Sequence, residues 1–577
     1  MFDVSLRWFR LASSIVAATL VTGCAVGPDF HEPAPPDVDR YTAEPTALHT
    51  ASSDAKSGQS ERLAPGRDLS ADWWALFKSP SLNALMAQAL QNNPNVQSAI
   101  ASLRAAKEAV YAQQAQFLPL VQANFSPSRQ ESPAIYSTFA PSFGNPPVTA
   151  NVYTAQVSVS YVFDVWGQNR RAVEALQALA DTQGFQVEAA YLTLTSGLAG
   201  AAINEASLRG QIDATEQIIA LNRKMLVILR QQFNTGYASR NDVALQEAAL
   251  AQEEATLPPL RKALQQNRDM ISALLGVYAG AEEPRATFKL DNLQLPTDLP
   301  VSLPSQLITQ RPDIRAAQEQ LHAAGAQVGV ATAALLPNFT ISGNLGYTQS
   351  MLGSLFEPAS AGWLIGANAL QTVFDGGILL HKLRGAQGTY EAAAWGYRST
   401  VVSAVQNVAD SIRAIQNDAQ TLKAARDFER AAKISYDLAQ QQMQTGYANI
   451  LVLLTAQQTY LQAVMQVVQA RAARLADAVA LYSALGGGWW NRAVPPTEQI
   501  LNTDTGQSAI LVDAHEAPSP DAPPPSSDNP VLRTLASMFR KPSSQSADQT
   551  ATPPPSPAPP AAAPATATAV AQSGVQQ

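Results

Sequence analysis

The sequence is poor in several features that would point to particular functions. Only 15% of its 577 residues are charged and the net charge is −8, so the composition favours no nucleic-acid partner. After Cys24, no segment offers about 18 uninterrupted apolar residues, so a transmembrane helix is not expected. A chain of this kind that crossed a membrane would have to do so as a closed barrel.

Catalytic and metal-binding patterns are also scarce. The five histidines, at positions 31, 49, 322, 381 and 515, have no metal-ligand spacing. No glycine-rich phosphate loop with its lysine is present. We therefore expect no enzyme, no metal and no cofactor, and the energy for any transport must come from a partner.

The single cysteine, Cys24, follows a short targeting segment. Two arginines precede an apolar run, 11–21, that is too short to span a bilayer, and Gly23 stands directly before the cysteine. This order is typical of a signal peptide over 1–23. Its end resembles a bacterial lipobox, which implies a covalent lipid on Cys24, and Ala25 after it implies sorting to the outer membrane. The alternative is an ordinary buried free cysteine.

One stretch, 311–347, holds a helix, a stop and a strand in a single run. Pro312 suits a first helical position, and Asp313 places a negative charge where the helix dipole favours it. Apolar residues then keep the 3/4 spacing of a coiled-coil seam until Pro337 ends the helix. Alternating apolar and polar residues from Phe339 onward predict a strand with one polar face.

The same unit occurs earlier in the chain. Shifted back by 218 positions, the seam recurs with Asn93-Pro94 at its start, and Thr235-Gly236-Tyr237 matches Thr445-Gly446-Tyr447 at an offset of 210. Landmarks that keep their order and nearly their spacing indicate a tandem duplication. Chance similarity in an Ala/Gln-rich sequence is the alternative.

The duplication organises the rest of the chain. Trp73 and Trp74 open a short helical stretch, and they predict either buried packing or a membrane-interface anchor. The tail is rich in Pro, Ala, Ser and Thr and is expected to be disordered. The expected segments are a signal peptide (1–23), a lipidated tether (24–65), an N-terminal equatorial helix (66–92), a first repeat (93–276), an irregular Pro-rich linker (277–310), a second repeat (311–486), a closing segment (487–494) and the tail (495–577).

Each repeat predicts two strands followed by very long helices. Strand pairs are expected within about 121–163 and 338–374, with a long loop near 130–148; a soluble hairpin with one wet face would show the same alternation. A proline-free tract of this length makes a helix of about 100 Å, which must project from its domain. The predicted helices are 94–117, 167–232, 240–275 (with a break or kink at Pro258-Pro259), 312–335, 377–443 and 449–484.

Four strands per chain are too few to close a barrel. Three chains would provide twelve, with the polar strand face lining the lumen and the long helices forming a tube beneath. The expected fold class is mainly α with a membrane β-barrel: a trimer with a 12-stranded β-barrel and an α-helical barrel.

Three runs carry a resemblance to a known family: RPDIRAAQEQL…ALLPNFTISGNLGY, DWWALFKSPSLNALMAQALQNNPNV and ALYSALGGGWW. They resemble the outer membrane efflux protein family, and the start TGCAVGPDF resembles its nodulation-protein-T-like lipoprotein branch. The resemblance implies a homotrimeric exit duct whose β-barrel lies in the outer membrane and continues into a periplasmic α-helical barrel. It also implies two partners, a periplasmic adaptor and an inner-membrane pump (proton-driven, or an ABC transporter), that expel toxic compounds.

The resemblance also assigns roles to the helix turns. It implies that the hairpin tips contact the adaptor, although the same residues suit plain helix turns equally well. It places a constriction inside the second tip, where Leu451 fits a hydrophobic ring, while Val452 and Thr455 stand where aspartates are frequent. Asp242 is then the nearest acid, and a weak cation preference is the hypothesis. The tip residues are Thr235, Gly236, Tyr237, Ala238, Thr445, Gly446, Tyr447 and Ala448.

Two other interpretations remain open at this point. The same fold could serve type I secretion or metal-ion efflux, although the eight methionines do not cluster. A lipid-anchored periplasmic coiled-coil scaffold that crosses no membrane belongs to a different class, and the strand alternation disfavours it.

Overall fold

The computed structural model describes residues 25–492, except 36–37, 39, 46, 133–147 and 281–285. The predicted signal peptide, the Cys24 lipidation site, most of the loop expected near 130–148 and the predicted tail lie outside the described residues.

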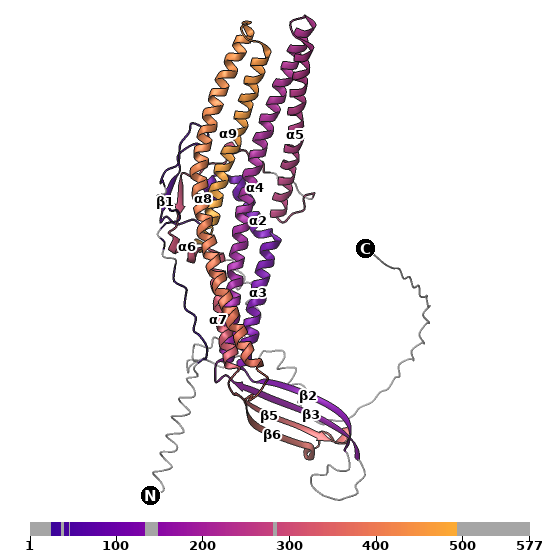
Figure 1. Cartoon of the computed structure of the whole chain (residues 1–577). Helices are drawn as coiled ribbons and strands as arrows, with labels where there is room; N and C mark the ends of the chain where they lie inside the picture. Colours follow the sequence, from indigo (N-terminus) through magenta and orange to yellow (C-terminus); the bar gives the residue numbers. More distant parts are fainter. Residues whose placement is uncertain are drawn as a thin grey trace, which may run out of the picture. The chain divides into compact units, whose positions relative to one another are not determined.

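Each copy contributes one shorter helix and one long helical hairpin (Figure 1). Corresponding helices start 218 residues apart for the shorter pair and 210 apart for the hairpins. Both long helices have 67 residues and both returning helices have 35. None of the helices in the described ranges is long and apolar enough to cross a membrane. The bounds are α3 Pro94–Gln114, α4 Gln168–Asn234, α5 Arg240–Leu274, α7 Pro312–Ala333, α8 Ile378–Gln444 and α9 Ile450–Ala484.

A repeated aspartate starts each long helix. Asp164 accepts backbone N–H bonds from Asn169 and Arg170, both at 2.9 Å. Asp375 accepts them from Gly377 at 2.8 Å and Leu379 at 2.7 Å. The first N–H groups of a helix have no partner within the helix and carry positive dipole charge, so a carboxylate there is favourable. This explains why both copies have an aspartate at this point, in Phe163-Asp164 and Phe374-Asp375.

A break or kink was expected at Pro258-Pro259, and the structure shows no break: α5 continues through both prolines. Each proline removes one backbone donor. Both prolines lie on the exposed side of the helix, where water can satisfy the carbonyl groups that lose a partner. The helix therefore tolerates the pair without ending.

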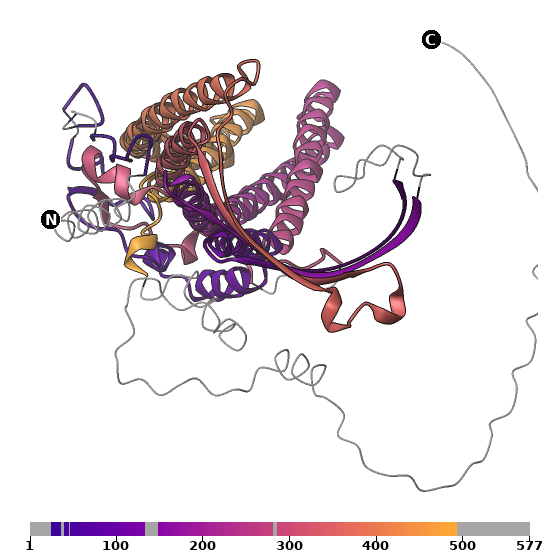
Figure 2. The same cartoon turned by 90° about the horizontal axis from the view of Figure 1, so that it is seen from below.

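The four long strands form one antiparallel sheet in the order β2-β3-β5-β6 (Figure 2). Apolar and polar rows of side chains alternate across the sheet. One row joins Val157, Leu345 and Trp363, and the next joins Ser158 to Asn344. The middle contact, β3 with β5, joins the two copies. The strands are β2 Leu120–Ser132, β3 Val148–Phe163, β5 Asn338–Gln349 and β6 Ala361–Leu370.

The segments expected to be an irregular tether and linker are partly ordered and packed. β1 (Arg62–Pro65) pairs in parallel with β4 (Asp298–Val301), and α6 (Pro304–Gln310) follows. Leu63 and Leu299 are buried. Strands of four residues are too short to show a period, so sequence patterning could not find them.

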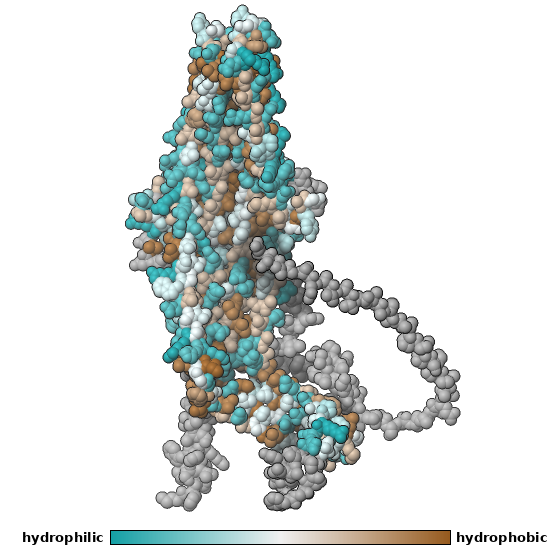
Figure 3. Space-filling model, turned by 45° about the vertical axis from the view of Figure 1, so that its right-hand side comes forward, coloured by the Kyte–Doolittle hydropathy of each residue, from teal (hydrophilic) through white to brown (hydrophobic). Residues whose placement is uncertain are grey.

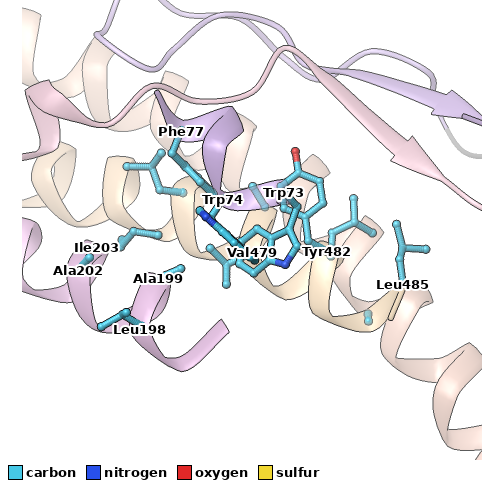
Figure 4. Packing of buried hydrophobic residues seen from close by; sticks show 14 of the residues in the cluster. Trp73, Trp74, Phe77, Leu198, Ala199, Ala202, Ile203, Val479, Tyr482 and Leu485 are labelled. Atoms are coloured by element: carbon cyan, nitrogen blue, oxygen red, sulfur yellow. The ribbon is translucent and has the colours of Figure 1, made fainter. Parts of the chain in front are cut away.

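The tryptophan pair lies in the core of the helical part, as the packing alternative predicts. Trp73 is fully buried and Trp74 nearly so, within η1 (Trp73–Phe77), which precedes α2 (Pro80–Asn92). Figure 4 shows both rings between Tyr482 and Val479 of α9 and Leu198 and Ala199 of α4. The N-terminal segment is thus fixed to helices from both copies.

Candidate functional site

The two hairpin tips have the same backbone turn. Gly236 has φ +83° and Gly446 has φ +79°, a left-handed conformation that favours glycine. The N–H of Tyr237 donates to the carbonyl of Gln232 at 2.8 Å, and Tyr447 makes the equivalent bond at 2.8 Å. These bonds, with those of the glycine N–H groups, form Schellman caps that satisfy the last carbonyls of α4 and α8.

Each tip exposes one tyrosine, but the helices that follow the two tips have different N-terminal caps. Tyr237 is 87% exposed and Tyr447 is 88% exposed, so both rings are available to a partner. At the first tip, Ser239 and Asp242 form a capping box, and the Ser239 N–H and hydroxyl donate to Asp242 at 2.9 and 2.7 Å. These hydrogen bonds lower the pKa of Asp242. At the second tip, Asn449 alone caps α9.

Apolar contacts below the tips join the two hairpins. Leu229 and Val243 pack between α4 and α5 with Ala238 beside them, and Leu453 packs against Met225 of α4. Ile450 contacts both clusters. The two hairpins are therefore packed together just below their tips. Figure 3 shows apolar residues exposed close to the hairpin ends.

Only two of the four constriction candidates line the same groove. Leu451 and Thr455 are one turn apart, so they lie on the same side of α9, and the Thr455 hydroxyl donates to the Leu451 carbonyl at 2.9 Å. Both line a groove of about 740 Å³ whose floor is α4 and whose sides are α5 and α9. Val452 and Asp242 do not line it. The structure thus brings together two of the four.

The groove is rich in amide side chains. Gln246 is fully buried and donates to the Asn222 side-chain oxygen at 2.9 Å, which fixes α5 to α4. Among the lining residues only Glu253 is ionisable, and burial raises the pKa of its carboxyl. The lining residues are Thr215, Ile218, Asn222, Leu245, Gln246, Ala249, Gln252, Glu253, Thr256, Pro259, Leu260, Leu451, Leu454, Thr455, Gln457, Gln458, Leu461, Gln462, Met465 and Gln466.

The segment directly after Cys24 is held on the helices near the sheet. The Val26 N–H donates to the Trp166 carbonyl at 3.1 Å. Arg171 of α4 donates to the Val26 carbonyl at 3.2 Å and pairs with Asp29 at 2.6 Å. A lipid on Cys24 would thus be attached two residues from a contact at the junction of strand and helix.

A histidine on α7 completes this attachment. The His322 ring stacks on Phe30 with centroids 4.3 Å apart. Its Nε2 lies 3.0 Å from Glu174 of α4, and its Nδ1 lies 3.3 Å from Glu319. Both ring nitrogens of His322 therefore have carboxylate neighbours, and its position on the helix face is explained without a role as a metal ligand. Throughout the described ranges, no group of three or more His, Cys, Asp or Glu could hold a metal ion.

Sequence reasoning missed the buried charges. Arg474 of α9 and Glu61 pair at 2.6 Å with both side chains 1% exposed. Glu205 of α4 is also fully buried, 2.7 Å from Arg209. One signal was available, because Arg474 stands among alanines and leucines on the apolar side of its helix. Its partner could not be deduced, since Glu61 lies more than 400 residues away in a segment without periodicity.

Three kinds of comparison bear on this architecture. The family model described as "Outer membrane efflux protein" matches residues 85–277 and 303–487, which together span both copies.

Curated proteins of similar sequence cover most of the chain. The pyoverdine export outer membrane protein OpmQ of Pseudomonas aeruginosa is 31% identical over 443 residues, covering 75% of this chain and 92% of that protein. The probable efflux pump outer membrane protein TtgC of Pseudomonas putida is 27% identical over 491 residues, covering 85% of this chain and 98% of that protein.

Solved structures of similar fold include two channels. The outer-membrane channel OprN matches with a TM-score of 0.69 and 26% identity, covering 81% of this chain and 100% of that one. The outer membrane protein VceC of Vibrio cholerae matches with a TM-score of 0.65 and 26% identity, covering 72% of this chain and 99% of that one.

Proposed function

Because the chain belongs to the outer membrane efflux protein family, we propose that three copies form the exit duct of a tripartite pump for toxic compounds. The protein is an outer membrane efflux channel. In the proposed duct it is a passive conduit that receives its cargo from a periplasmic adaptor and a proton-driven inner-membrane pump. The names of similar proteins mention pyoverdine, toluene and antibiotics as the cargo of those proteins.

The observation that carries the proposal is the pair of open sheet edges. β2 and β6 end the sheet, and almost every residue of β6 is exposed in a single chain, including Trp363 and Ile365. Unpaired backbone groups cannot face lipid, so a sheet in a membrane must close on itself. Two copies would give a barrel of about eight strands, filled by side chains, whereas three give about twelve and leave a lumen.

The exposed face of α8 supports the same assembly. Tyr390 and Trp395 are 39% and 60% exposed. Their counterparts 210 positions earlier are Ala180, which is buried, and Phe185, which is half-buried beside α7. α4 is covered by α7 of the other copy, so α8 would be covered by the α3 of the next protomer in a ring.

The repeat offsets of 210 and 218 residues identify a specific contact between neighbouring protomers. Arg171 packs against Gly329, and the matching positions are His381 on α8 and Tyr111 on α3. Both of these residues are exposed in the single chain. We expect cysteines at His381 and Tyr111 to form a disulfide between neighbouring protomers, because the Cβ atoms would lie within reach of a bond.

The test is oxidation of the double variant in native membranes, followed by denaturing electrophoresis. Covalent trimers are the expected product, and each single-cysteine variant is the matched control. A double variant with cysteines at His381 and Thr235, which lie at opposite ends of the helices, should stay monomeric. Monomer alone from the His381/Tyr111 pair would refute the ring.

The hairpin tips and the groove supply the remaining roles. We propose that Tyr237 and Tyr447, held outward by identical turns, contact the adaptor. Leu451 and Thr455 form the constriction, while the carboxylate of Asp242 is occupied by Ser239. A weak cation preference follows because neither Leu451 nor Thr455 carries a charge.

Single-channel reversal potentials test this proposal. Thr455→Asp should raise cation selectivity, whereas Val452→Asp, at a position that does not line the groove, should raise it less. Strong cation selectivity in the unchanged protein would contradict the assignment.

The lipid anchor is a separate proposal. Cys24 is expected to carry a thioether-linked lipid, and metabolic labelling with palmitate tests it. Cys24→Ser should lose the label, and unchanged labelling of that variant would exclude Cys24 as the acceptor.

A further inference from the structure

The connection between β5 and β6 exposes three large apolar side chains. β5 starts beside α7 and runs away from the helices, so this connection lies at the far end of the sheet (Figure 1). Met351, Leu352 and Phe356 are 66%, 57% and 69% exposed. We call residues 350–360 the ledge, and its one charged residue is Glu357. Large apolar side chains gathered on one exposed segment mark a surface that meets an apolar partner.

The ledge has a defined internal structure. The Ser360 hydroxyl donates to the Ser354 carbonyl at 3.1 Å and accepts a bond from the Gln349 amide at 3.3 Å. Leu355 is fully buried, although it stands directly beside the exposed Phe356 in the sequence. The ledge therefore turns one apolar side chain inward and holds others outward. It consists of two 3-10 turns, η4 Leu352–Ser354 and η5 Pro358–Ser360.

A ring contact places the ledge on the apolar face of the sheet. The Phe356 ring meets the Tyr347 ring edge to face, with centroids 5.4 Å apart. Tyr347 follows Leu345 by two residues, so both side chains leave β5 on the same side. Leu345 lies in the apolar row with Val157 and Trp363. The ledge thus extends the apolar face of the sheet beyond the last residues of the strands.

The curvature of the sheet agrees with this placement. Figure 2 shows the sheet as an arc, with the connection between β5 and β6 on its convex side. When such an arc closes into a barrel, its concave side faces the lumen and its convex side faces lipid. Aromatic and other large apolar residues at the end of a membrane strand suit the level where acyl chains meet headgroups.

We propose that the ledge is a membrane-docking surface, with the side chains of Met351, Leu352 and Phe356 among the lipid acyl chains of the outer leaflet. The inference rests on the proposed duct, because only a closed barrel gives the sheet a lipid side. Moving these side chains from water into acyl chains is favourable. Glu357 is exposed and follows Phe356 directly, so its carboxylate can stay at the headgroup level.

A single environment-sensitive label on the ledge tests the docking. Full-length Met351→Cys is labelled with a nitrobenzoxadiazole dye and reconstituted into phosphatidylcholine vesicles. Nitroxide groups on the lipid acyl chains should quench this label, whereas iodide in the water should not. The unchanged chain, whose only cysteine is Cys24, gives the labelling background.

Two matched sites on β5 separate this inference from the duct itself. Leu345→Cys carries the label on the apolar face, and nitroxide lipid should quench it. Thr348→Cys carries it on the opposite, polar face three residues from Met351, and only iodide should quench it. Both positions are exposed in the single chain.

Each outcome then has one meaning. Quenching of the Met351 label by nitroxide lipid, as for Leu345, supports the docking. If the Met351 label follows the Thr348 label, or is shielded from both quenchers by protein, the docking is overturned while the barrel stands. If nitroxide lipid fails to quench even the Leu345 label, the sheet has no lipid face and the proposed duct fails with it.

Discussion

The two helical hairpins have the same lengths and the same turns, but they are held together by different means. In the first, the lock lies within the hairpin: Arg268 of α5 lies 3.4 Å from Glu205 of α4, and Arg209 lies 2.7 Å from the same carboxylate. Asn267 adds a bond to the Ala201 carbonyl at 2.9 Å. No outside segment is needed for these contacts.

The second hairpin has no such internal lock. At the positions equivalent to Glu205, Arg209 and Arg268 it has Ile415, Ala419 and Ala478, all buried. Its buried ionic contact joins Arg474 to Glu61 of the N-terminal segment 50–62, which we call the strap. Apolar contacts are non-directional, so helices joined by them can shift more readily than helices joined by paired charges. The two copies therefore share their geometry, but the second hairpin takes its buried ion pair from a segment outside the repeats.

The largest expected effect comes from breaking the strap's ion pair. Arg474→Met leaves Glu61 buried without a partner, and removing one member of a buried pair typically destabilises by about 3–5 kcal/mol. Urea unfolding of the detergent-solubilised protein should show this loss, with exchange increasing first in α8 and α9.

The double variant Glu61→Leu/Arg474→Met is the control, because it removes both charges. Replacing a whole buried pair with apolar residues is often nearly neutral. Loss of stability equal to that of the single variant would mean that packing, and not charge, fixes the strap.

The matching change in the first hairpin should have a smaller effect. Glu205→Gln removes the carboxylate, but the Arg209 side chain is 26% exposed and can turn to water. We expect about 2–3 kcal/mol of destabilisation, since a hydrogen bond to a charged group is lost while one cation is rescued by solvent. Exchange should increase in α4 and α5, and the strap should keep its protection. Loosening of the strap instead would show that the hairpins are coupled through their core.

The sequence predicted the hairpins closely because their signals are local. Proline-free Ala- and Gln-rich tracts, repeated aspartate caps and Thr-Gly-Tyr turns are each visible within a few residues. The bounds differ by one to three residues from those predicted, as for α3, which ends at Gln114 and not at 117. The strand alternation was also local, and all four long strands were found.

The strap and the buried charges were not predictable in the same way. β1, which begins where the strap ends, pairs with β4 more than 230 residues away, and each of these two strands has only four residues. An isolated Glu61 gives no hint of burial, because charged residues are normally exposed. The groove illustrates the same limit: periodicity places Leu451 and Thr455 on one face of α9, but only the packing of α4 and α5 shows what that face meets.

The tip glycines should respond equally in both hairpins, which tests whether the turns are equivalent. Gly236→Ala and Gly446→Ala place a side chain at a left-handed position, which is unfavourable by about 1–2 kcal/mol. Neither glycine has a heavy atom within 4 Å of the added carbon, so the effect is conformational and not steric. Thermal unfolding of the two variants should match. A clearly larger loss at Gly446 would mean that the second tip is constrained by contacts that the single chain lacks.

The smallest effect is expected at the one titrating group that distinguishes the tips. Hydrogen bonds from Ser239 lower the pKa of Asp242, so its cap stabilises the start of α5 above the ordinary aspartate range. That stabilisation is lost as pH falls through the lowered pKa. Exchange at 239–243 should therefore increase only in strong acid, whereas the second tip, capped by Asn449, should show no matching step. Asp242→Asn should remove the step and make the first tip behave as the second does. An acid step that survives in this variant would have to come from another carboxylate. In that case the difference between the two hairpins would lie in the strap and the internal lock alone, and not in how their tips begin.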